Sequence, residues 1–204
     1  ILLKELGRLD ESEKQYRKAI SLNPNYFEAY NNLGITLREL GRLKQSEQIF
    51  KKLTETIPQN FEVFNNFGIT LRNLRKFEDA KQFFKTAIKL KPDNAEYYFN
   101  LGITERDLGK LENSELWLKK AISLNPNYFQ AYNDLGITLS NLKRLKESDY
   151  NFNKAIELNS HYAKAYLNLS HNYLIKKDFK KASELYEWRW KIKKDLDKKL
   201  FKNK

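Results

Sequence analysis

The chain has 204 residues, of which 41% are hydrophobic and 31% charged, and its formal net charge is +12. It has no cysteine, which excludes disulfides and thiolate metal sites, and no apolar run of the ~20 residues that a membrane span needs. Residues 163–204 carry +8 of the net charge, so the rest offers no continuous basic stripe and we expect no nucleic-acid partner. Without cysteine or a signal-peptide pattern, the sequence predicts a cytoplasmic location.

The most regular feature of the sequence is a spacing of 34 residues between prolines and between glycines. The prolines are Pro24, Pro58, Pro92 and Pro126, and the glycines are Gly34, Gly68, Gly102 and Gly136. Such a fixed interval predicts an array of one supersecondary unit. We place the array at 1–196, with a partial repeat at 1–26, repeats at 27–60, 61–94, 95–128, 129–162 and 163–196, and a basic tail at 197–204. Because residue 1 falls inside a predicted helix, we expect the chain to be a piece of a longer protein.

Within each repeat, two apolar stripes predict two antiparallel helices. With the glycine at position 8, apolar residues recur at positions 4, 7, 11 and 14, and again at 17, 24 and 28. In the repeat 61–94 these are Phe64, Phe67, Leu71, Leu74, Phe77, Phe84 and Ile88. This spacing keeps the side chains on one face of each helix, so each repeat is predicted to be a helical hairpin.

Residues at the helix ends support these boundaries. Gly41 and Gly109 fall between the two helices, where a left-handed residue ends a helix, and Arg75, Lys143 and Lys177 take the same place elsewhere. The prolines end the second helices. Capping boxes are predicted to open the following helices, at Asn25-x-x-Glu28, Asp93-x-x-Glu96 and Asn127-x-x-Gln130.

Small residues at positions 8 and 20 predict close contact between the two helices of a hairpin. Examples are Gly34 with Ser46 and Gly68 with Ala80. One hairpin cannot bury its apolar stripe alone, so neighbouring hairpins must stack. The predicted fold class is an all-α solenoid.

This pattern resembles the tetratricopeptide repeat (TPR), with an aromatic residue at position 4, leucine at 7, glycine or alanine at 8, alanine at 20, an aromatic at 24 and proline at 32. The resemblance extends over nearly the whole chain. It implies a right-handed α-solenoid whose first helices line a concave groove for a peptide or protein.

The resemblance places positions 5, 6 and 9 of the first helices in that groove, and the residues at these positions are the predicted peptide-binding residues. They are Asn31, Asn32, Ile35, Asn65, Asn66, Ile69, Asn100, Ile103, Asn133, Asp134, Ile137, Asn168 and His171. An asparagine side chain can bond to both the C=O and the N–H of an extended peptide, so such a column would bind peptide backbone. The alternative is that the asparagines bond to neighbouring helices. The isoleucines are either a groove floor or packing between repeats.

Two subfamilies of the TPR family imply different functions. The chaperone-binding clamp needs lysine at position 5 and asparagine at position 9, and this sequence has neither. The asparagine column is similar to the repeats of O-linked N-acetylglucosamine transferases, and so is the segment 185–191. We therefore expect a peptide-binding scaffold without cofactor, metal or catalysis, or, alternatively, the substrate-recruiting arm of a larger glycosyltransferase. Weak self-association is expected through uncapped ends of the array.

Glu105 interrupts the apolar stripe at position 11. It either recognises a basic group of a ligand or reaches out to solvent near the helix end and pairs with a neighbouring lysine. We favour the second interpretation, which predicts that leucine at this position would stabilise the repeat.

Overall fold

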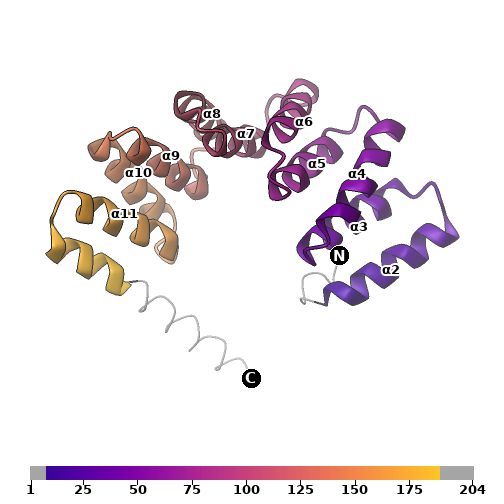
Figure 1. Cartoon of the computed structure of the whole chain (residues 1–204), viewed down its shortest axis with the longest axis horizontal. Helices are drawn as coiled ribbons and strands as arrows, with labels where there is room; N and C mark the ends of the chain where they lie inside the picture. Colours follow the sequence, from indigo (N-terminus) through magenta and orange to yellow (C-terminus); the bar gives the residue numbers. More distant parts are fainter. Residues whose placement is uncertain (1–7, 189–204) are drawn as a thin grey trace. The chain divides into compact units, whose positions relative to one another are not determined.

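The computed structural model describes residues 8–188 of the chain (Figure 1). The chain divides into two compact units, 1–108 and 109–204. Residues 189–204, which include the predicted basic tail, lie outside the described residues, as do residues 1–7.

The described part of the first unit consists of consecutive α-helices. They are α2 (Leu9–Leu22), α3 (Phe27–Glu39), α4 (Leu43–Thr56), α5 (Phe61–Asn73), α6 (Phe77–Leu90) and α7 (Ala95–Asp107). Each helix packs against the next one in the chain, and α5 also contacts both α3 and α7. The first helices of successive repeats therefore lie side by side in this unit.

The second unit has the same organisation. Its helices are α8 (Leu111–Leu124), α9 (Phe129–Asn141), α10 (Leu145–Leu158) and α11 (Ala163–Ile175), and residues 179–188 are again helical. Here α9 packs against α8, α10 and α11. The all-α class and the consecutive helical hairpins predicted from the spacing are confirmed.

An aromatic ring at position 24 explains the glycine at position 8. Phe50, Phe84 and Phe152 are at most 1% exposed. A Cβ atom built on Gly68 would lie 2.6 Å from the Phe84 ring, and Gly34 and Gly136 are equally close to their own phenylalanines. The serine at position 20 also approaches this point, because Ser46 Oγ donates to the Gly34 carbonyl at 2.8 Å. The helices are thus close, as predicted, but the ring over the glycine sets the size limit.

A buried polar layer, which the sequence analysis missed, joins neighbouring repeats. Ser46 and Thr70 hydroxyls lie 3.1 Å apart, and those of Ser114 and Thr138 lie 3.0 Å apart, in both cases 24 residues apart in the chain. All four side chains are fully buried. Thr70 Oγ1 also lies within hydrogen-bond distance of the Asn66 carbonyl, and Thr138 Oγ1 of the Asp134 carbonyl, so neither pair has an unpaired hydroxyl. This pairing fixes the register between one hairpin and the next.

The turns between the two helices adopt the predicted left-handed conformation. Gly41 and Gly109 have φ near +75°, and Arg75, Lys143 and Lys177 have φ of 60–62°. The turns at Gly41, Arg75, Lys143 and Lys177 are each closed by the backbone bond of a Schellman motif, such as Lys76 N to Leu71 O at 2.9 Å. The three non-glycine residues therefore carry the cost of left-handed backbone, about 1–2 kcal/mol each.

We expect Arg75→Gly to raise the free energy of unfolding relative to Arg75→Ala by about 1–2 kcal/mol. Both substitutions remove the contact of the guanidinium with the Phe77 ring, so the comparison isolates the backbone conformation. Urea denaturation of the two variants measures the difference. Equal stabilities would contradict the assignment of backbone cost to this turn.

The predicted capping boxes are wrong by one residue. The helices α3, α7 and α9 have Tyr26, Asn94 and Tyr128 as N-caps, and only Asn94 accepts a side-chain cap bond, from Glu96 N at 2.9 Å. A different asparagine orders the preceding turn: Asn23 Oδ1 accepts from Asn25 N, and Asn125 Oδ1 accepts from Asn127 N. Asn23 and Asn125, which follow the preceding helices, thus bond to the backbone N–H of the residues predicted as caps.

Candidate functional site

The predicted asparagine column forms pairs between successive repeats. In each pair, Nδ2 of the position-6 asparagine donates to Oδ1 of the position-5 asparagine one repeat earlier. The amide pairs are Asn66–Asn31 at 3.1 Å, Asn100–Asn65 at 2.9 Å and Asn168–Asn133 at 2.8 Å. These six residues therefore bond to a neighbouring helix, and their contact with a peptide stays a prediction.

The amide pairs leave one group of each position-6 asparagine unused. The Oδ1 atoms of Asn66, Asn100 and Asn168 accept no hydrogen bond from any described residue, yet none of them is buried without a partner. Each can therefore accept from a ligand, while its Nδ2 is held by the neighbouring repeat. The first pair is fixed further, because the Asn66 backbone carbonyl accepts from Arg38 at 3.2 Å.

Exposure differs along the predicted column. Asn65 and Asn133 are 4% and 2% exposed, so they lie under the surface as acceptors for the next repeat. The half-buried members are Asn31, Asn32, Ile35, Asn66, Ile69, Asp134, Ile137 and Asn168, whereas Asn100 and Ile103 are buried and His171 is exposed. In the first unit, Ile35 and Ile69 are thus half-buried and Ile103 is buried, so these isoleucines contribute partly to packing.

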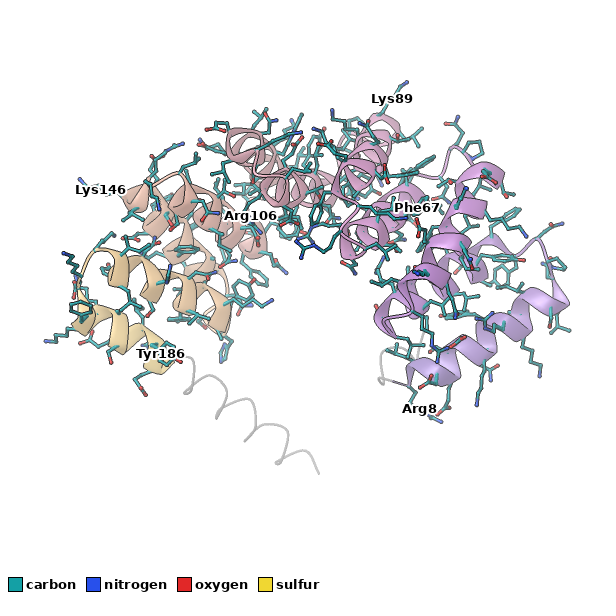
Figure 2. The ribbon with its side chains drawn as sticks, in the orientation of Figure 1. Arg8, Phe67, Lys89, Arg106, Lys146 and Tyr186 are labelled. Carbon is teal, nitrogen blue, oxygen red and sulfur yellow. The ribbon has the colours of Figure 1, made fainter. Side chains whose placement is uncertain are left out.

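In the first unit, arginines at position 12 lie on the same face of the first helices as the asparagines, and their side chains already interact with other residues of the protein. Burial lowers the pKa of Arg38, against the opposing effect of Glu39 and Glu96. Arg72 Nε lies 2.7 Å from Asp107 Oδ2. Lysines on the second helices differ from these arginines: Lys89 on α6 and Lys146 on α10 are exposed and extend into solvent (Figure 2).

Glu105 does not reach solvent, so that part of its interpretation is wrong. Its side chain is 2% exposed, and Oε1 lies 3.0 Å from Nζ of Lys81, which is itself only 13% exposed. The predicted pairing with a lysine is confirmed, but the pair is buried. Since Lys81 already occupies the carboxylate, Glu105 is a structural group of the first unit rather than a ligand contact.

In the second unit, three predicted residues meet in one pocket between α9, α11 and the turn after α9. Ile137, Asn168 and His171 line it, together with Asn141 and Lys143. Its volume is about 160 Å³. The same face of the helices that carries an amide pair therefore also carries a cavity.

Neither metal chemistry nor a membrane span is visible in the described part of the chain. Residues 8–188 contain no group of three or more His, Cys, Asp or Glu side chains that could hold a metal ion. None of the helices described there is long and apolar enough to cross a bilayer.

Models of one repeat family match most of the sequence. Those described as TPR repeat or tetratricopeptide repeat match residues 2–41, 27–60, 65–129, 117–149 and 163–187. The chain is a TPR protein. No curated protein matches this TPR protein along its sequence.

Solved TPR structures share the fold of this protein at low sequence identity. MamA of Desulfovibrio magneticus RS-1 has a TM-score of 0.73 at 20% identity, covering 85% of this chain and 98% of MamA. YrrB, described as a TPR protein with an unusual peptide-binding site, has a TM-score of 0.64 at 23% identity, covering 88% and 93%. Cut9 in its hetero-tetramer with Hcn1 has a TM-score of 0.82 at 19% identity, covering 93% of this chain and 38% of that one.

Proposed function

We propose that this TPR protein is a scaffold that binds an extended polypeptide across its first helices and carries out no chemistry of its own. The observation that supports this function is the set of amide pairs, which hold the position-6 carbonyls in place and leave them free to accept. A polypeptide offers backbone N–H groups to such acceptors whatever its sequence. Peptide binding in YrrB, which has the same fold, is consistent with this use of the surface.

The affinity expected from these contacts is modest. Each hydrogen bond contributes a net of about 0.5–1.5 kcal/mol. Within each unit, such bonds and the apolar contacts to the half-buried isoleucines must offset the cost of ordering a flexible peptide. The dissociation constant should therefore lie between about micromolar and millimolar. Because the contacts are to neutral amides, binding should weaken only slightly as salt rises.

We expect the quadruple substitution of Asn32, Asn66, Asn100 and Asn168 by alanine to weaken peptide binding at least about tenfold, since it removes the position-6 carbonyls. Isothermal titration with an unstructured, uncharged decapeptide measures the change, and circular dichroism checks that helicity is kept. Asn31→Ala is the comparison variant: it removes the partner that holds Asn66 but leaves the Asn66 carbonyl, so it should weaken binding less than the quadruple variant. Undiminished binding by the folded quadruple variant would place the binding surface elsewhere.

The second candidate function is the substrate-recruiting arm of a larger glycosyltransferase. The asparagine column favours it, because the column is the feature that resembles the repeats of O-linked N-acetylglucosamine transferases. The full-length reading frame tests it: a glycosyltransferase domain after residue 204 supports this candidate, and a stop codon there removes it. Weak self-association through the ends of the array stays a prediction, which sedimentation velocity measures.

A further inference from the structure

We propose that the pocket between α9 and α11 selects a carboxylate side chain, aspartate or glutamate, of the polypeptide that the first helices bind. This inference rests on the proposed function and adds a sequence preference to a surface that otherwise contacts backbone. The pocket lies beside the amide pair Asn168–Asn133, so a strand held there has a side chain within reach of it.

The size of the pocket suits one side chain. A volume of about 160 Å³ is well below the ~300–1,000 Å³ of sites that enclose small molecules. Ile137 and Ile175 line the pocket, and both keep part of their surface exposed. They provide apolar contact for the methylene groups of an aspartate or glutamate side chain.

Three of the polar side chains that line the pocket are unpaired. The Lys143 ammonium, the Asn141 amide and the His171 ring form no side-chain hydrogen bond or ion pair with any described residue, and all three residues are exposed. No acidic side chain lines the pocket. A cation and two potential donors without a counter-charge favour a singly charged acceptor such as a carboxylate.

The acidic residue behind the pocket does not cancel this charge. Asp149 does not line the pocket, and it accepts a hydrogen bond from Asn172, which does and is 1% exposed. Asp149 is also paired with Lys176. The amide of Asn172 is fully used, since it donates to Ser148 and Asp149 and accepts from Ser140. The wall behind the ligand is therefore neutral and fixed.

The turn that carries Lys143 is closed by backbone hydrogen bonds, so its side chain starts from a defined point. Lys143 has φ of 62°, and its N–H donates to the Ser140 carbonyl at 2.9 Å. Lys177 provides a matched control. It has the same φ at the same place in the next turn, is also exposed, and does not line the pocket.

The test uses two capped hexapeptides, acetyl-Ala-Ile-Glu-Ile-Ala-Ser-amide and the same peptide with glutamine in place of glutamate. Binding is followed by the amide shifts of the isotope-labelled chain. We expect the glutamate peptide to bind at least about fivefold more tightly and to shift the signals of Asn141 and His171. Lys143→Gln should abolish the preference, and Lys177→Gln should leave it unchanged although the net charge falls equally.

The outcomes separate this inference from the proposed function. Equal affinity for the two peptides, with shifts at the amide pairs, would overturn the carboxylate pocket and leave the scaffold function standing. A preference lost equally in both lysine variants would also overturn it, since net charge would then be the cause. Failure of both peptides to bind at millimolar concentration would count against the proposed function itself.

Discussion

Replacing Lys81 by methionine should lower the free energy of unfolding by about 3–5 kcal/mol, because it leaves the Glu105 carboxylate buried without its partner. The ammonium is 3.0 Å from that carboxylate, which is 2% exposed. The exposed Glu78, at 4.0 Å from Lys81, loses a far weaker interaction in solvent. Urea denaturation of the parent and the variant measures the change.

Two further variants show whether burial is the cause. Lys76→Met breaks a surface pair with Glu47, whose atoms lie 2.6 Å apart, and it should cost at most about 1 kcal/mol. The double variant Lys81→Met, Glu105→Leu should return to within about 1 kcal/mol of the parent or exceed it, since apolar side chains often replace a buried pair without loss. A cost below about 1 kcal/mol for Lys81→Met alone would contradict the account of the pair.

Gly68→Ala should destabilise the parent by about 1–3 kcal/mol, although alanine is the better helix former. The new Cβ would lie 2.6 Å from the Phe84 ring, which is fully buried, so the ring or the helix backbone must shift. Thermal or urea denaturation gives the change in stability.

Gly68→Ala should have the opposite effect on stability in a variant that lacks the Phe84 ring. Phe84→Ala should itself cost about 3–5 kcal/mol, as expected for a buried aromatic. In that background Gly68→Ala should stabilise by about 1 kcal/mol, because the helix propensity of alanine is gained and the methyl group enters the vacated space. Stabilisation of the parent by Gly68→Ala would show that the ring does not limit position 8.

The fold could be predicted because its signals are periodic and local. The residue between two apolar stripes can be assigned to a turn without knowledge of the rest of the fold. The left-handed conformation of Arg75, Lys143 and Lys177 therefore followed from their place in the repeat. The capping boxes failed on a local competition instead. Before α3 and α9, Asn23 and Asn125 bond to the N–H of the residue that was predicted as the cap, and the helix starts one residue later.

The candidate site was less predictable because its contacts join different repeats. The repeat alignment showed asparagine at positions 5 and 6, but the 35-residue spacing of the amide pairs depends on the register between hairpins. Glu105 shows the same limit, since its partner Lys81 is 24 residues earlier on another helix. Alanines such as Ala87 and Ala121 are fully buried, yet a small residue gives little signal in an apolar stripe.

The pocket in the second unit also escaped sequence analysis. Ile137, Asn168 and His171 were predicted to face a ligand, but Lys143 belongs to a turn and was interpreted only as a replacement for glycine. A signal was present in the sequence: the three turn residues that are not glycine are all basic. Only the structure shows that one of them lines a cavity.

The most direct test of the scaffold function is a paramagnetic relaxation experiment with an uncharged decapeptide that carries a nitroxide at its centre. If the polypeptide lies across the first helices of either unit, the side-chain amide signal of Asn66 in the first unit or of Asn168 in the second should broaden at millimolar peptide, and the signals of Lys89 and Lys146 should not. Broadening confined to Lys89 and Lys146, on the second helices, or no broadening at all, would contradict the proposed binding surface.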